Sequence, residues 1–164
     1  MIALQWQDRV LSLLDQAAYP QEENWINCST LQEAVEALSS GKIIDEKVAA
    51  VAGAYAYCLA ALEHQEELLT PAFDQALNEA KQMLLNARPG SHQMADAITF
   101  MENPPENYTK NADRLTALLA TAVTFDRKQV ITSRNICSNG CDLISKDTRI
   151  LIRTDSGRFH GAAP

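Results

Sequence analysis

Positive charge is scarce in this sequence. Its 164 residues include 14 lysines and arginines against 21 aspartates and glutamates, which gives a formal net charge of −7 at pH 7. A surface that binds nucleic acid or an anionic membrane needs clustered basic side chains, because the phosphates that it meets are negative. The short basic run over 146–153 is too small to change this balance. We therefore expect neither nucleic acid nor a membrane as a partner.

A basic leader and a long apolar run are also lacking. The opening residues, "MIALQWQDRV", show no basic start followed by an apolar core of the kind found in secretory signals. The most apolar stretch, 48–62, is short for a membrane span and includes tyrosines and a cysteine. These absences predict a cytoplasmic protein, in which the four cysteines remain reduced thiols.

Metal-binding motifs are equally sparse. Cys137 and Cys141 are four residues apart, a spacing at which two helical side chains can share a metal ion. The sequence has no second pair and no histidine close to them. We therefore predict no metal site and no cofactor, and expect these two cysteines to be buried or half-buried.

The residues that are present are sufficient for a folded domain. Apolar residues make up 46% of the chain, and no long low-complexity tract argues for disorder. The first segment alternates around a polar break, with Leu4 and Trp6 before it and Val10 and Leu13 after it. This pattern predicts a β-hairpin, and Trp25 marks a possible third short strand.

Helical signals dominate the rest of the chain. Ser29 and Thr30 form a capping-box pattern with the residues three positions later, and Gly41 is a plausible stop. Asp45 can cap a second helix, for which the apolar spacing predicts one buried face. Gly53 and its many alanine neighbours would make this helix thin. Further helices are expected after Thr70-Pro71, after Ser91, and over about 109–143.

A final strand is predicted over 148–152, after the helices. The predicted fold class is therefore mainly α with a small N-terminal antiparallel β element, an α+β arrangement. We expect residues 1–145 to form a helical domain. Residues 146–164 read as the first strand and loop of a second unit, because a buried strand that ends in a polar loop commonly opens an α/β site.

Five stretches, in this order, resemble the N-terminal part of the S-methyl-5-thioribose-1-phosphate isomerase family. This family shares a superfamily with ribose-1,5-bisphosphate isomerases and the regulatory subunits of translation initiation factor 2B. The stretches are "ALQWQDRVLSLLDQ", "CSTLQEAVEAL", "AAVAGAYAYCLAALE", "NARPGSHQMADAITFM" and "SRNICSNGCDLISKDTRILIRTDSG". The resemblance implies a helical N-terminal domain with a small sheet, and it implies that residues 146–164 begin a Rossmann-like second domain that is absent or truncated.

The resemblance also implies where the family's chemistry would lie. The arginine of the family's Ala-Arg-Pro-Thr segment corresponds to Arg88, and a glycine of its cysteine loop corresponds to Gly157; both would be phosphate contacts. The catalytic cysteine corresponds to Thr154 and the asparagine after it to Asp155. The family's Arg-Gly-Ala-Pro loop corresponds to "IDEK", which replaces a phosphate cradle with carboxylates at positions 45 and 46.

The acid/base pair of the family is therefore missing, since Thr154 is a poor general acid and the second-domain aspartate has no counterpart. Two alternatives remain open for Arg88, an anion contact or a cation at a helix end. Three remain open for function. The chain is a non-catalytic relative that acts through protein binding or homo-oligomerisation, a sugar-phosphate isomerase completed by a second chain or by altered residues, or a gene remnant or fragment without a function. An alanine-rich helix with Tyr55 and Tyr57 is one expected interface.

Overall fold

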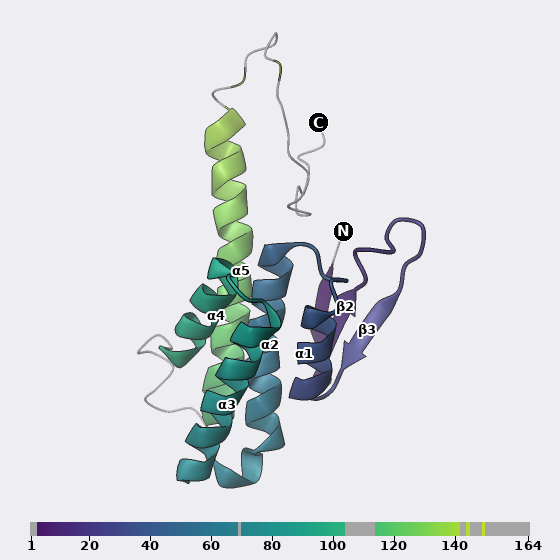
Figure 1. Cartoon of the computed structure of the whole chain (residues 1–164). Coiled ribbons are helices and arrows are strands. Elements are labelled where there is room, and N and C mark those ends of the chain that lie inside the picture. Colours follow the sequence, from purple (N-terminus) through teal and green to yellow (C-terminus); the bar gives the residue numbers. More distant parts are fainter. Residues whose placement is uncertain (1–2, 69, 104–113, 142–143, 145–148, 150–164) are drawn as a thin grey trace.

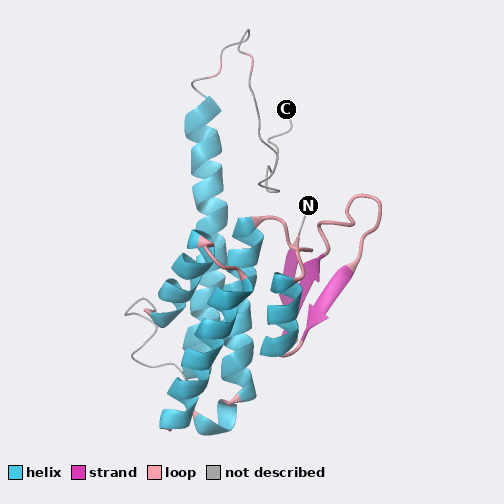
Figure 2. Ribbon diagram, in the orientation of Figure 1, coloured by secondary structure: helices cyan, strands magenta, loops and turns pink. Residues whose placement is uncertain are grey.

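The computed structural model describes residues 3–68, 70–103, 114–141, 144 and 149 (Figure 1). Three short strands come first, followed by a helical body and one long helix that extends beyond it (Figure 2). In chain order the elements are β1 (Leu4–Gln7), β2 (Val10–Leu14), β3 (Trp25–Cys28), α1 (Leu31–Ser39), α2 (Glu46–Glu63), the 3₁₀ turn η1 (Gln65–Glu67), α3 (Pro71–Ala87), α4 (His92–Glu102) and α5 (Arg114–Cys141). The predicted fold class, mainly helical with a small N-terminal antiparallel sheet, is confirmed.

The sheet is a meander of order β1-β2-β3, antiparallel throughout. Asp8 and Arg9 join β1 to β2 with φ angles of 51° and 65°. Two left-handed residues in a two-residue connection give the turn a twist that matches paired strands. The predicted hairpin and third strand are therefore both confirmed.

Local capping signals set the ends of the helices. Thr30 caps α1, and its capping box with Glu33 is complete because each side chain bonds the other residue's backbone N–H. Asp45 caps α2 and Ser91 caps α4, as predicted. Thr70 is the N-cap residue of α3 without a side-chain cap bond, and Pro71 takes the first helical position. Gly41 follows α1 with φ of 76°, a conformation that favours glycine.

Helix α2 forms the centre of the body. It packs against α1, α3, α4 and α5 and against β1 and β2, and every residue from Val48 to Ala61 is buried. The prediction of one buried face was wrong, because neighbours cover this helix on all sides. The prediction of an interface through Tyr55 and Tyr57 was also wrong. Each is only 5% exposed, and Tyr55 stacks on Trp6 with ring centroids 5.2 Å apart.

The close approach expected at Gly53 is confirmed. A Cβ atom at this position would overlap the Sδ atom of Met94, a fully buried residue of α4. The missing side chain therefore sets how closely α2 and α4 pack.

Helix α5 is buried only along its first half. Leu118, Ala122 and Phe125 face the core. The helix then rises beyond the body (Figure 1), and Cys137 and Cys141 are exposed. The prediction that both cysteines would be buried or half-buried was wrong, because the body does not reach this part of the helix.

None of the helices in the described part of the chain combines the length and the apolarity needed to cross a membrane. The strand predicted over 148–152 and the proposed unit 146–164 lie outside the described residues, so the domain boundary remains a prediction.

Candidate functional site

An open pocket lies where the end of α1, the start of α2 and the turn between α3 and α4 meet. Its volume is about 510 Å³. The lining residues come from two stretches that are far apart in the sequence, 38–46 and 87–93: Leu38, Ser39, Gly41, Glu46, Ala87, Arg88, Pro89, Gly90, Ser91, His92 and Gln93. The pocket therefore contains the arginine singled out from the sequence and one of the two carboxylates expected beside it.

The turn between α3 and α4 presents Arg88 to this pocket. Helix α3 ends at Ala87, and Arg88 leaves the helical conformation with φ of −135° before Pro89. Gly90 has φ of 79°, which reverses the chain, and Ser91 then caps α4 by accepting a hydrogen bond from the Met94 N–H at 3.2 Å. The Pro-Gly step thus fixes the position of Arg88 relative to the first turn of α4.

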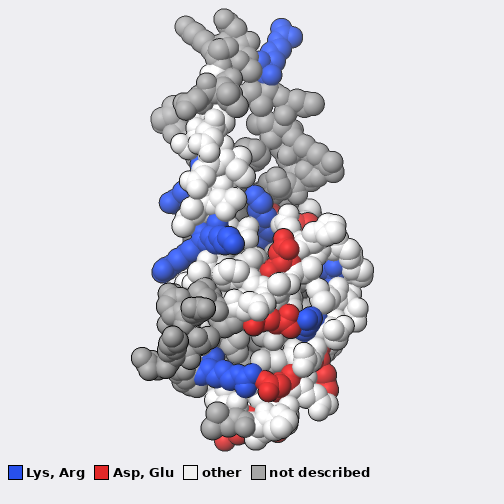
Figure 3. Space-filling view, turned by 90° about the vertical axis from the view of Figure 1, so that its left-hand side faces the viewer, with Lys and Arg blue, Asp and Glu red and all other residues white. Residues whose placement is uncertain are grey.

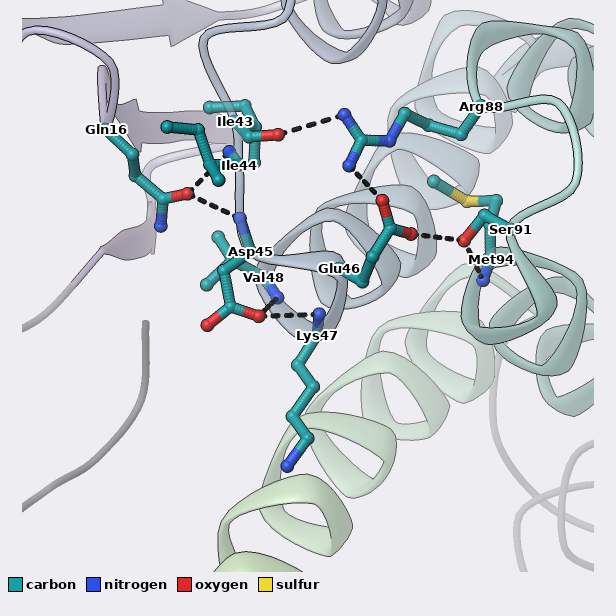
Figure 4. A network of polar contacts seen from close by, with 10 residues as sticks. All are labelled: Gln16, Ile43, Ile44, Asp45, Glu46, Lys47, Val48, Arg88, Ser91 and Met94. Atoms are coloured by element: carbon teal, nitrogen blue, oxygen red, sulfur yellow. Dashed lines mark hydrogen bonds and ion pairs between the residues drawn. The ribbon is translucent and has the colours of Figure 1, made fainter. Parts of the chain in front are cut away.

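Arg88 is already bound within the chain. Its Nη1 donates to the Ile43 carbonyl oxygen at 2.9 Å, and its Nη2 forms an ion pair with Oε1 of Glu46 (Figure 4). The Arg88 side chain is 15% exposed, whereas that of Glu46 is 45% exposed. The other oxygen of Glu46, Oε2, accepts from the Ser91 hydroxyl at 2.5 Å. Both oxygens of the carboxylate therefore have partners, and the cation is compensated.

Asp45 occupies the adjoining N-terminus of α2. Its Oδ1 accepts from the backbone N–H groups of Lys47 and Val48 at 2.8 and 3.4 Å. Gln16 Oε1 accepts from the N–H groups of Ile44 and Asp45 at 2.7 and 2.8 Å (Figure 4). A helix N-terminus attracts anions because its first N–H groups lack partners. Here the chain's own side-chain oxygens take the N–H groups that a phosphate would need.

The structure brings together two segments that the resemblance assigned to one phosphate site. Arg88 lies beside the "IDEK" stretch, within which Ile44 is 52% exposed and Asp45 is 1% exposed. The phosphate role of Arg88 remains a prediction. Thr154, Asp155 and Gly157, predicted for catalysis and phosphate binding, lie outside the described residues. The sequence analysis considered the charges of Arg88 and Glu46 separately. The resemblance assigned both residues to one phosphate site, and their opposite charges already indicated that they would pair.

Sequence reasoning also missed three contributors to this network, Gln16, the Ile43 carbonyl and the Ser91 hydroxyl. No residue pattern pointed to the first two, because a glutamine in a loop and a backbone oxygen have no distinctive spacing. His92 is exposed and lines the pocket at the start of α4. Across the described ranges, no group of three or more histidine, cysteine, aspartate or glutamate side chains is placed to hold a metal ion.

Comparisons with known proteins agree with this fold. Methylthioribose-1-phosphate isomerase of Pseudomonas fluorescens (strain Pf0-1) is 31% identical over 144 residues, covering 88% of this chain and 40% of that protein. The isomerase of Thermosipho melanesiensis is 25% identical over 156 residues, covering 95% and 45%. The chain thus spans less than half the length of these curated relatives.

Two solved structures share the fold. The delta subunit of translation initiation factor eIF-2B from A. fulgidus superposes with a TM-score of 0.68 at 21% identity, over 88% of this chain and 42% of that one. The 5-methylthioribose 1-phosphate isomerase from Pyrococcus horikoshii OT3 gives a TM-score of 0.64 at 14% identity, over 77% and 36%.

The resemblance inferred from the five sequence stretches is therefore confirmed. The model of the initiation factor 2 subunit family matches residues 41–163, which include Glu46, Arg88 and Ser91 of the candidate site and all of α2 to α5. Since this match covers most of the chain, the protein belongs to the initiation factor 2 subunit family.

Proposed function

We propose that this chain is a non-catalytic member of its family, which acts through protein binding or oligomerisation and does not isomerise a sugar phosphate alone. The observation that carries the proposal is the internal pairing of Arg88. Both of its terminal nitrogens are bound to groups of the chain, the Ile43 carbonyl and Glu46. A phosphate that entered this pocket would have to displace a carboxylate that is already in place.

The free energy of the Glu46 contacts supports weak phosphate binding at Arg88. A hydrogen bond to a charged group contributes about 1.5–3 kcal/mol net, and every 1.4 kcal/mol is about a factor of ten in affinity. Displacing Glu46 from Arg88 and Ser91 would therefore weaken phosphate binding by about ten- to a hundredfold or more. A phosphate site of useful affinity is not expected in this arrangement.

The alternative is a sugar-phosphate isomerase completed by a second chain. The relatives named as isomerases are more than twice as long as the part that this chain matches. A second polypeptide would then have to supply the acid/base pair and draw Glu46 away from Arg88. The pocket beside Arg88, Ser91 and His92 would be the phosphate end of such a composite site.

A titration with inorganic phosphate and with methylthioribose 1-phosphate tests the proposal. Calorimetry on the wild-type chain should detect no binding up to about 10 mM ligand, a limit that corresponds to a very weak interaction. The variant Glu46→Gln removes the competing charge, so it should bind phosphate at least tenfold more tightly than wild type. Glu79→Gln, an exposed position of α3 with the same change in charge, is the control and should not gain affinity.

Turnover completes the test. Micromolar binding of methylthioribose 1-phosphate to the wild-type chain, or its conversion to the ketose by that chain alone, would contradict the proposal. Turnover only after a second polypeptide is added would favour the composite isomerase instead. A Glu46→Gln chain that binds phosphate no better than the Glu79→Gln control would show that Glu46 is not what blocks the pocket.

A further inference from the structure

Strand β3 forms one edge of the sheet. The strand order is β1-β2-β3, and the described residues contain no further strand beyond β3 (Figure 2). An edge strand has backbone N–H and C=O groups without a partner on one side, and proteins commonly protect such an edge with lysine, proline or a bulge. The four residues of β3, Trp25–Cys28, include neither lysine nor proline, and their register with β2 contains no bulge. This edge is therefore able to accept another strand.

The register shows which backbone groups of β3 face outward. The Asp15 N–H donates to the Asn24 carbonyl at 2.8 Å, and in an antiparallel pair every second residue bonds the partner strand. Ile26 therefore bonds β2, whereas Trp25 and Asn27 on either side of it direct their N–H and C=O groups away from β2. No hydrogen bond from the described residues reaches these outward groups. Two donors and two acceptors are thus available to an added strand.

A groove runs along this free edge. Its volume is about 280 Å³, and β3 contributes Ile26 and Asn27 to its lining. Successive side chains of a strand point to opposite faces of the sheet, so a groove that both residues line lies at the edge and not on one face. The other wall is formed by helix α1 and the residues just after it: Glu33, Glu36, Ala37, Ser40 and Lys42. An added strand would therefore lie between β3 and a helix.

The groove is acidic. Glu33 and Glu36 are exposed, and the described groups that donate hydrogen bonds to their carboxylates are neutral. The ammonium of Lys42, the cation of the lining, lies 3.6 Å from Oδ2 of Asp15, which compensates its charge. On the α4 and α5 side of the molecule, by contrast, basic side chains lie next to acidic ones (Figure 3). The free edge of β3 is thus lined by two negative charges that no described cation balances.

We propose that β3 binds an extended basic segment of another protein, which adds to the sheet as a fourth, antiparallel strand. This inference rests on the proposed function, for which it names the surface and the kind of partner. The segment's backbone would bond Trp25 and Asn27, and its side chain opposite Ile26 would lie against α1. An arginine or lysine there can lay its apolar stem along Ile26 and Ala37 and bring its charged end to Glu36.

Charge disfavours a second copy of this chain as the occupant. Two β3 edges that paired with each other would bring the Glu33 and Glu36 carboxylates of both copies into one groove. The whole chain, with a net charge of −7, also repels a copy of itself. A basic segment meets attraction where a second copy meets repulsion, and its affinity should fall as salt rises.

Titration of the full chain with synthetic peptides tests the proposal. The probe is Arg-Val-Arg-Val-Arg with blocked ends, which can pair as a strand and has the required charge. Two control peptides separate these properties. Glu-Val-Glu-Val-Glu reverses the charge, and Arg-Pro-Arg-Pro-Arg keeps it but cannot form a regular strand ladder. We expect the probe to bind with a dissociation constant of the order of 100 µM, and both controls to bind at least about tenfold more weakly.

Hydrogen exchange, followed by NMR on the isotope-labelled chain, locates the binding site. In the free chain the N–H groups of Trp25 and Asn27 should exchange quickly because they face solvent, and that of Ile26 slowly because it bonds β2. With the probe at about ten times its dissociation constant, exchange at Trp25 and Asn27 should slow about tenfold. Exchange at Ile26 should change little.

Two pairs of variants test the backbone and the charge separately. Asn27→Pro removes one outward N–H without removing a bond to β2, and it should weaken probe binding at least about tenfold. Asn27→Ala is its matched control, because it loses the same side chain but keeps the N–H and should bind like wild type. Circular dichroism checks that the proline variant is folded. Independently of that variant, Glu36→Lys should weaken probe binding about fivefold or more, whereas Glu79→Lys on the exposed side of α3 should not.

A wild-type chain that does not bind the probe at about 1 mM would overturn the inference. Equal binding of Arg-Pro-Arg-Pro-Arg would also overturn it, because charge alone would then account for the affinity. Exchange at Asn27 that slows with protein concentration, without peptide, would show that two copies pair at this edge instead. A chain that fails these tests but does not turn over the sugar phosphate keeps the proposed function. Turnover by the chain alone would end the proposed function and leave the peptide result unchanged.

Discussion

Replacing Gly53 by alanine should destabilise this protein, although alanine is the better helix former. In an exposed helix interior this substitution stabilises by about 0.8–1 kcal/mol. At Gly53 the new Cβ would overlap Met94 Sδ, and Met94 is fully buried in the first turn of α4. Overpacking of a close-packed core costs about 1–3 kcal/mol, so the net effect should be a loss of about 1 kcal/mol.

A double-mutant cycle separates the gain in helix propensity from the cost of overpacking against Met94. Met94→Ala alone should cost about 2–5 kcal/mol, because it leaves a cavity between α2 and α4. In that background Gly53→Ala no longer meets the sulfur atom and should stabilise by about 1 kcal/mol. The effect of Gly53→Ala on the free energy of unfolding therefore changes sign when Met94 is replaced by alanine. Urea unfolding followed by far-ultraviolet circular dichroism measures all four proteins.

Gly140→Ala is the matched control for this prediction. The same substitution is made in a helix, but at a position with open space around it, so it should be neutral or stabilising by up to about 1 kcal/mol. If Gly53→Ala is instead more stable than wild type, Met94 can move aside at no cost. The argument that Gly53 sets the spacing of α2 and α4 would then be refuted.

Three further predictions concern side chains elsewhere. Ellman's reagent should react quickly with the two exposed cysteines of α5 and slowly with Cys28 and Cys58. Burial, with a smaller contribution from Glu33, raises the pKa of Cys28 to about 11, and burial also raises the pKa of Cys58. Four equal reaction rates would contradict this prediction. Hydrogen bonds from Ser29 and Thr30 lower the pKa of Glu33 below its ordinary 4.5, so its stabilising effect is present above that pH and is lost as pH falls through the lowered value. Urea midpoints measured between about pH 7 and pH 3 should therefore fall less steeply for Glu33→Gln than for wild type. Parallel curves would show that Glu33 does not contribute to the pH dependence of stability. Asp45→Ala should cost about 1–2 kcal/mol in the same assay, whereas Asp45→Asn should cost less because it keeps an acceptor for the first N–H groups of α2.

The sequence allowed prediction of those parts of the fold that depend on neighbours along the chain. The hairpin around Asp8 and Arg9 and the caps at Thr30 and Asp45 are local, since turn geometry and N–H partners lie within a few residues. The all-round burial of α2 could not be predicted in this way. Alanine fits either a surface or a crowded interior, so the apolar pattern indicated one buried face, whereas four helices and two strands surround α2 in the fold.

The same limit explains the errors at Cys137 and at the candidate site. An apolar stripe indicates which side of a helix faces a core, but it does not indicate where the body ends along the helix axis, and Cys137 lies beyond that end. At the site, the resemblance led to Arg88, and only the three-dimensional arrangement showed that Glu46 and the Ile43 carbonyl had taken its donors. Contacts between residues more than forty positions apart leave no spacing pattern in a single sequence.

The enclosure of α2 has a consequence for how the protein opens. Because four helices and two strands cover it, no subset of them can detach while leaving its amides shielded. Its backbone N–H groups should therefore exchange with deuterium only through unfolding of the whole body, at the slowest rates in the chain. The part of α5 beyond Ser133 is largely exposed among the described residues and should exchange through local fraying. One polypeptide would then contain a single cooperative unit and a helical arm that opens independently of it.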